Sequence, residues 1–198
     1  MKIFSVMVLL NLCVLGLAGC SGGNTAVNNA NSNRADSGIS SSVYNGNIDA
    51  GISGSGTELK DFVTQTATGG IAEVELGRLA QNKAQNAEVK NFARKMVQDH
   101  SNANTELKAL AGKKNVTLPI EMDAEHKALR DKLAKLSGAE FDREYMKGQV
   151  VSHERTVGLF QRQADKGSDP DVKSWATKTL PNLRMHLEMA REITGKLK

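Results

Sequence analysis

The chain has 198 residues and a formal net charge of +4 at neutral pH. Its charged residues alternate in sign along the predicted helices instead of forming a basic block, which disfavours a nucleic-acid-binding function. The two cysteines, Cys13 and Cys20, both lie in the first twenty residues, so we expect no disulfide framework and no thiol chemistry in the folded domain.

The N-terminal residues have the features of a secretory signal. Lys2 precedes an apolar run from Ile3 to Leu17, which is too short for a membrane-spanning helix. The following "LAGC", ending at Cys20, resembles the lipobox of bacterial lipoproteins, in which the cysteine is acylated and becomes the mature N-terminus. This resemblance implies a signal peptide over residues 1–19 and membrane lipid as a partner through Cys20. Ser21, in place of aspartate, implies an outer membrane lipoprotein that faces the periplasm.

Residues 20–56 are predicted to form a flexible tether. They are rich in Gly, Ser and Asn, and apart from Tyr44 they contain almost no large apolar side chain that could order them. Random-coil scaling gives such a tether an average span of roughly 30 Å, enough to hold a domain clear of a lipid surface. Residues 57–198 are then long enough for one domain.

Apolar residues follow a helical period from Thr57 onward, and no strand-like alternation occurs. The pattern predicts a first long helix over residues 57–84, capped by Thr57, and a second over residues 86–112, beginning at Asn86. A shorter helix is expected between Asp123 and Leu136, inside a long connection.

Two further long helices have clear start signals. The third is expected over residues 137–166, with Ser137 and Glu140 as a capping box. The fourth opens with Asp169 as N-cap and Pro170 at its first position, and Pro181 should bend it near the middle.

An internal repeat indicates how these helices are arranged. "NAEVKNFARK" from Asn86 recurs as "DPDVKSWATK" from Asp169, and each copy follows the turn of a helical hairpin. The sequence therefore predicts an all-α four-helix bundle made of two antiparallel hairpins. The connection over residues 113–136 is long enough to cross the bundle, which would put the two hairpin turns at opposite ends.

Each long helix carries one ionisable residue on its apolar seam: Glu73, His100, His153 and His186. Glu73 lies thirteen residues before Asn86 and His100 fourteen after it, so the two should share one height. His153 and His186 lie sixteen residues before and seventeen after Asp169. All four side chains are expected to meet near the middle of the bundle.

Two interpretations of this cluster stay open. One is a hydrogen-bonded Glu–His cluster without metal. The other is a site for one divalent transition-metal ion (Zn, Fe or Cu) held by Glu73 and two or three of the histidines. Either would offset the cost of burying the carboxylate, which is several kcal/mol when it has no partner. Asp99, Glu154 and Tyr145 are candidates for supporting contacts behind these ligands.

The segments "FARKMVQDH", "SGAEFDREYMKGQVVSHERTV" and "LPNLRMHLEMA" resemble the domain of unknown function 4142 family over Asp61 to about Ile193. This family consists of exported bacterial proteins grouped with the ferritin-like superfamily. The resemblance implies a ferritin-like four-helix bundle with a long crossover that carries a short extra helix. It implies no particular activity and no particular protein partner.

The sequence departs from true ferritins at the positions that matter for chemistry. Val97, Val150 and Leu183 stand three residues before the seam histidines, so the Glu-x-x-His motif of di-iron proteins is absent. This disfavours an enzyme with di-iron chemistry. We expect a non-enzymatic envelope lipoprotein that acts as a binding or structural module in envelope integrity or stress tolerance, with a single-metal-ion binding module as the alternative.

Overall fold

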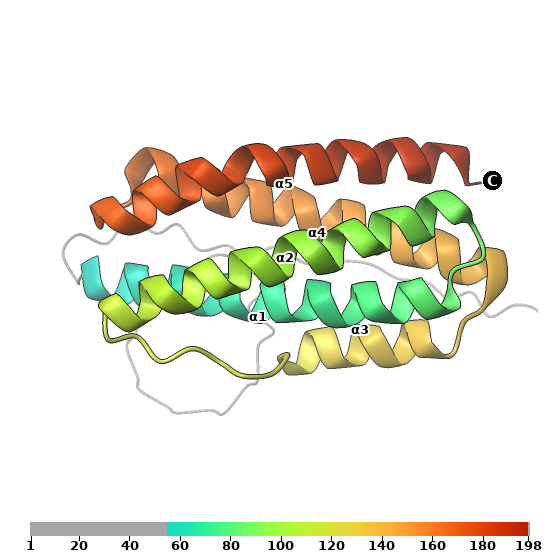
Figure 1. Cartoon of the computed structure of the whole chain (residues 1–198), viewed down its shortest axis with the longest axis horizontal. Helices are drawn as coiled ribbons and strands as arrows, with labels where there is room; N and C mark the ends of the chain where they lie inside the picture. The colour runs from blue at the N-terminus through green and yellow to red at the C-terminus, as the bar shows by residue number, and fades with distance from the viewer. Residues whose placement is uncertain (1–54, 198) are drawn as a thin grey trace, which may run out of the picture. The chain divides into compact units, whose positions relative to one another are not determined.

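The computed structural model describes residues 55–197, which form five α-helices and no strand (Figure 1). The helices are α1 Ser55–Lys83, α2 Ala87–Lys113, α3 Ala124–Ala134, α4 Gly138–Lys166 and α5 Pro170–Lys196. The predicted all-α class is confirmed. The predicted signal peptide, the predicted lipidation site Cys20 and nearly all of the predicted tether lie outside the described residues. No helix within 55–197 is both long and apolar enough to cross a membrane.

The four long helices pack as two antiparallel hairpins, α1–α2 and α4–α5, laid against each other. Figure 1 shows the two hairpin turns at opposite ends of the bundle, as the long crossover predicted. Ion pairs join each turn to the other hairpin. Lys196 near the end of α5 lies 3.1 Å from Glu88 of α2, and Lys114 after α2 lies 2.7 Å from Asp169 at the second turn.

The internal repeat marks two equivalent helix starts. The Asn86 side chain accepts hydrogen bonds from the backbone N–H groups of Glu88 and Val89. The Asp169 side chain accepts from Asp171 and Val172 in the same way. Each cap satisfies N–H groups that a helix leaves without a partner.

The first turn is also held from the opposite hairpin. Asp142 of α4 is 2% exposed, and its carboxylate accepts hydrogen bonds from the backbone N–H groups of Gln85 (3.1 Å) and Asn86 (2.8 Å). The carboxylate thereby satisfies two turn amides that α2 itself cannot. This contact gives Asp142 a structural role that the sequence alone did not predict.

Two predicted capping interactions are wrong, although Ser137 is the N-cap of α4 as predicted. Helix α1 begins at Ser55, so Thr57 lies inside its first turn and is not the cap. The capping box at α4 does not form either, since the Ser137 side chain makes no capping hydrogen bond to any described residue. Gly138 turns the chain there with a φ of +59°, a left-handed conformation that favours glycine. The Leu136 carbonyl accepts instead from Lys83 Nζ at 2.8 Å.

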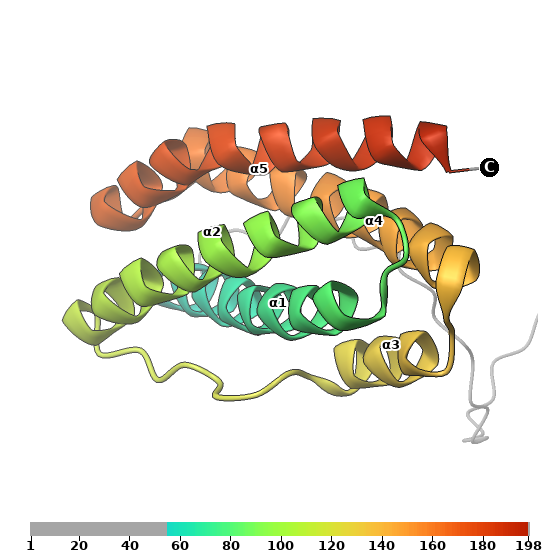
Figure 2. The same cartoon turned by 45° about the vertical axis from the view of Figure 1, so that its right-hand side comes forward.

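The crossover carries the predicted short helix. Helix α3 is capped by the Asp123 side chain, which accepts from the His126 N–H, and it packs against α1 and α4 (Figure 2). Its buried residue is Leu133. Helix α5 continues through Pro181, and Figure 2 shows its N-terminal half inclined to its C-terminal half.

Two apolar clusters fill the ends of the bundle. The cluster near the α1–α2 turn is built on Phe92, Phe141, Tyr145, Met96, Met146 and Ile193. The cluster near the α4–α5 turn is built on Phe62, Phe160, Trp175, Leu107, Leu180 and Leu183. Between them lies a layer of buried polar side chains, called here the central polar layer: Glu73, His100, Gln149, His153 and His186.

Candidate metal centre

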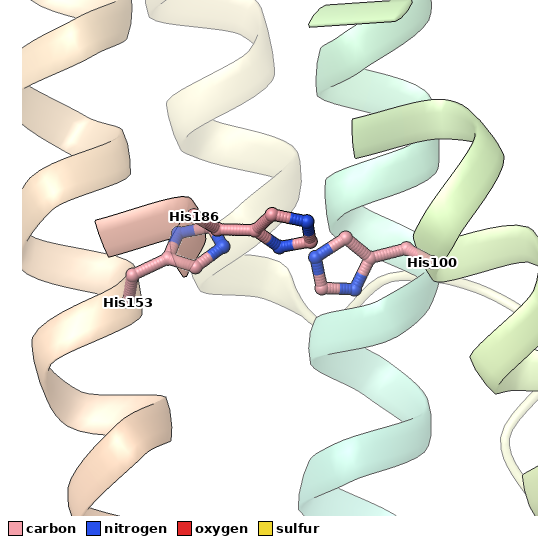
Figure 3. A group of neighbouring side chains, drawn as sticks. All are labelled: His100, His153 and His186. Atoms are coloured by element: carbon pink, nitrogen blue, oxygen red, sulfur yellow. The ribbon is translucent and has the colours of Figure 1, made fainter. Parts of the chain in front are cut away.

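The structure brings together the four seam residues that the sequence singled out, one from each long helix. Glu73 is 5% exposed, His100 is 8%, and His153 and His186 are each 1%. Figure 3 shows the three imidazoles converging from α2, α4 and α5. Their ring centroids are 5.5 to 5.8 Å apart. The three histidines therefore form one compact cluster, in the single cross-section that equal heights along the hairpins predict.

A backbone contact sets the proton position on His153. Its Nδ1 lies 3.0 Å from the Gln149 carbonyl oxygen, one helical turn earlier. A carbonyl only accepts, so Nδ1 carries the hydrogen, and in the neutral ring Nε2 then has the lone pair. That Nε2 is buried and has no hydrogen-bond partner among residues 55–197.

The carboxylate of Asp99 sets the proton position on His186. Its Nε2 donates to Asp99 Oδ2 at 2.7 Å, and Asp99 is itself bound by Lys95 (3.0 Å) and Asn182 (3.3 Å). The other ring nitrogen of His186, Nδ1, is buried and has no partner in the described part of the chain. Metal-binding histidines are commonly oriented by such an outer carboxylate. Asp99 therefore orients the His186 ring.

His100 completes the nitrogen cluster. Its buried Nε2 also has no partner within the described bundle, and one ring nitrogen from each of the three histidines lies within 4.8 Å of the others. Zinc–imidazole bonds of about 2.0–2.1 Å would place the nitrogens of a tetrahedral site roughly 3.4 Å apart. Small rotations of the rings would bring the three nitrogens from within 4.8 Å of one another to about 3.4 Å around one ion.

The buried carboxylate of Glu73 lies at the edge of this cluster. Its Oε1 accepts a hydrogen bond from Ser152 Oγ at 2.8 Å and stands 4.0 Å from His153 Nδ1. Its Oε2 is buried without a partner among the residues described. Burial raises the pKa of Glu73, but the neighbouring His153 and His100, together with hydrogen bonds from Gln149 and Ser152, outweigh that effect and hold the pKa below its ordinary value. A carboxylate with a lowered pKa is ionised at neutral pH.

Burial keeps at least two of the imidazoles neutral. It lowers the pKa of His100, and it lowers the pKa of His186 to about 4 although the hydrogen bond to Asp99 opposes this. Neutral imidazole is the form that binds metal ions. At neutral pH the layer therefore presents lone pairs and a negative charge.

The other predicted supporting residues lie elsewhere. Glu154 is at the surface, where its carboxylate pairs with Arg191 at 2.7 Å, so the prediction that it supports a ligand is wrong. It follows His153 in the sequence, and the helical rotation turns it away from the seam. Tyr145 is buried in the apolar cluster and stacks on Phe141 with centroids 5.9 Å apart. Burial raises the pKa of its phenol well above the usual value, and its hydroxyl bonds to no described residue.

Sequence reasoning missed one member of the layer. Gln149 is 2% exposed, its carbonyl orients His153, and its side-chain Oε1 has no partner in the described region. Its position four residues before His153 was the available signal, because that spacing puts both on one helical face.

Comparison with solved structures identifies proteins of the same fold. A DUF305 fragment from Deinococcus radiodurans is 16% identical, with a TM-score of 0.63 over 71% of this chain and 97% of that one. CopM in its Cu(II)-bound form is 16% identical, with a TM-score of 0.60 over 70% of this chain and 97% of that one. CopM co-crystallised in an Ag-bound form is 18% identical, with a TM-score of 0.56 over 67% of this chain and 92% of that one.

These identities are low, so the likeness shows a shared fold alone. The comparison with curated proteins found no match. A sequence family described as a domain of unknown function (DUF4142) matches residues 50–193, which is most of the chain. The chain therefore belongs to the DUF4142 family.

Proposed function

We propose that this protein binds one transition-metal ion in the central polar layer, through His100, His153 and His186 with Glu73 beside them. The observation that carries the proposal is the arrangement of lone pairs. Two of the rings, His153 and His186, donate outward, so that their free nitrogens face the cluster. One nitrogen of each ring and Glu73 Oε2 are buried without a hydrogen-bond partner within residues 55–197, and a cation would stabilise such a group of atoms.

The ligand set favours copper(II) or zinc(II). Imidazole suits Zn, Cu, Fe and Ni, and affinity for divalent ions generally peaks at Cu(II). A di-iron centre is disfavoured because one carboxylate on the seam is too few to bridge two irons. CopM, a protein of the same fold, has been solved in Cu(II)-bound and Ag-bound forms, which supports a metal-handling function for this bundle.

The proposed setting is the inner face of the outer membrane. Acylation of Cys20 would anchor the chain, since each buried acyl methylene contributes about 0.8 kcal/mol and several chains make anchoring stable. The tether would let the bundle extend into the periplasm. Metal binding there would support envelope integrity or stress tolerance. The module would act by binding, without catalysing a reaction.

Metal titration of a thiol-free chain tests the proposal. The full chain, carrying Cys13→Ser and Cys20→Ser and purified without a histidine tag, is titrated with Cu(II) or Zn(II) alone and analysed for bound metal. We expect one ion per chain. Free metal at a thousand times Kd should stabilise the fold by about 4 kcal/mol through mass action. No change in melting temperature with either ion would overturn the proposal.

The chain offers a matched control for the ligands. His153→Ala should abolish stoichiometric binding, whereas His126→Ala should leave it unchanged. His126 lies on α3 and bonds to Asp123 at the helix start, away from the central polar layer. Equal loss of metal from both variants would show that the ion binds elsewhere.

Anchoring is tested separately in a Gram-negative host. We expect the wild-type chain to incorporate labelled fatty acid and to fractionate with the outer membrane, and Cys20→Ala to lose both properties. A wild-type chain that is exported without lipid would contradict the proposed anchor and leave the metal-binding proposal standing.

A further inference from the structure

A small cavity leads from the surface to the central polar layer. Its volume is about 60 Å³, room for a few water molecules. The lining runs from exposed Gln65, through half-buried Asn104 and Ser152, to buried Glu73 and His100. The cavity therefore connects solvent to one carboxylate and one imidazole of the candidate centre.

The inner wall of this cavity carries oxygen atoms that lack partners. Glu73 Oε2 and Thr66 Oγ1 are both buried without a hydrogen-bond partner in the described structure. Ser152 Oγ donates to Glu73 Oε1 and so holds the carboxylate in place. Unpartnered oxygens and a negative charge around a water-sized space attract a cation.

Two adjacent glycines of α1, Gly69 and Gly70, form part of the lining. A Cβ at Gly70 would lie 2.0 Å from Asn104 Oδ1, so glycine allows that amide to approach the helix. A Cβ at Gly69 would meet no described atom within 4 Å, so a side chain there would have open space to extend into. Glycine inside a helix costs roughly 0.5–1 kcal/mol relative to alanine. Glycine at position 69 therefore lowers helix stability but leaves the cavity unfilled.

We propose that this cavity is the path by which a metal cation reaches the histidine cluster, and that Glu73 receives the cation at its inner end and passes it to His100. This inference rests on the proposed metal-binding function and adds the route and the residue that govern uptake. The apolar clusters enclose the layer at both ends of the bundle. A cation that could not use the cavity would have to wait for the bundle to open locally.

The test separates the rate of binding from its strength. Cu(II) or Zn(II) alone is mixed with the thiol-free full chain in a stopped-flow instrument, and Gly69→Leu is compared with Gly148→Leu. Gly148 is also a mid-helix glycine with open space around it, and it lies outside the cavity lining. With the path filled, Gly69→Leu should slow both association and dissociation by about tenfold or more and leave Kd within threefold, because entry then depends on local opening. Gly148→Leu should bind at the wild-type rate.

A second variant tests the role of Glu73. Glu73→Gln keeps the side-chain shape and removes the charge, so association should slow by about tenfold and lose its dependence on ionic strength. This comparison stays informative if circular dichroism shows that Gly69→Leu is unfolded. If a folded Gly69→Leu variant, or Glu73→Gln, binds metal at the wild-type rate, the proposed access path is wrong. The proposed metal-binding function would be unaffected by that result. A wild-type chain that binds neither ion would instead overturn the proposed function.

Discussion

The central polar layer and the two apolar end clusters are equally buried but do different physical work. The end clusters hold Phe, Leu, Met and Trp side chains in close contact, which is where burial stabilises a helical bundle. The layer instead holds three imidazoles, with one ring nitrogen from each within 4.8 Å of the others, and a carboxylate beside them. Such a layer stabilises the fold little unless a cation fills it, which indicates that these side chains serve binding.

The largest expected effect is in the end clusters. Phe62 of α1 is 3% exposed and packs edge-to-face on Phe160 with centroids 5.2 Å apart. Phe62→Ala should cost about 3–5 kcal/mol of unfolding free energy, because it removes apolar contact and leaves a cavity. Denaturant unfolding of the metal-free chain measures this loss. A cost below about 1 kcal/mol would mean that this cluster does not support the bundle.

Acid should destabilise the metal-free protein through the layer. The pKa of His186 is about 4 in the folded state, against about 6.5 for a free histidine. Between these values the unfolded chain binds the proton and the folded chain does not, so this contribution is full above about pH 6.5 and is lost as the pH falls towards 4. His186 alone should account for up to about 3 kcal/mol. The lowered pKa of His100 acts in the same direction.

Unfolding titrations of wild type and His186→Gln across this pH range check the direction of the pH effect on stability and whether His186 causes it. The difference in stability between the two proteins should narrow as the pH falls from 6.5 to 4. Parallel curves for the two proteins would rule out His186 as the titrating group.

Replacing a residue of the central polar layer with an apolar one should not destabilise the metal-free protein, in contrast to Phe62→Ala in the end cluster. His153→Leu exchanges a buried imidazole for an apolar side chain of similar volume. It also removes the ring N–H that bonds to the Gln149 carbonyl, but that carbonyl lies inside helix α4. We expect the metal-free protein to be unchanged or more stable by about 1 kcal/mol, since buried polar groups can often be replaced by apolar ones at no cost. Metal binding should be lost. A cost of several kcal/mol in the metal-free state would show that the layer is itself a stabilising element.

The smallest effects are expected at the two repeated helix starts. Asn86→Ala and Asp169→Ala should each cost about 1 kcal/mol, as removal of an N-cap side chain usually does. Asp169 also pairs with Lys114 in the wild-type chain, so the cost of Asp169→Ala should shrink at high salt, whereas the cost of Asn86→Ala should not. Thermal unfolding at low and high ionic strength distinguishes them. Equal salt dependence would remove any role for the ion pair at the second turn.

The sequence by itself determined the helices, the two hairpins and the height of the histidines. Helical periodicity and the caps at Asn86 and Asp169 are local signals, and the fixed rise per residue converts positions in the chain into heights along a hairpin. For this reason the spacing of Glu73, His100, His153 and His186 along the chain is enough to place them in one layer.

Tertiary structure alone decided what surrounds that layer. The capping of the first turn by Asp142, the exposure of Glu154 and the cavity beside Gly69 depend on how one hairpin rotates and packs against the other. Spacing along a helix does not specify that rotation, because it follows from side-chain packing between elements far apart in the sequence. The same packing sets which imidazole nitrogens carry hydrogen, and hence which lone pairs remain free to bind a cation.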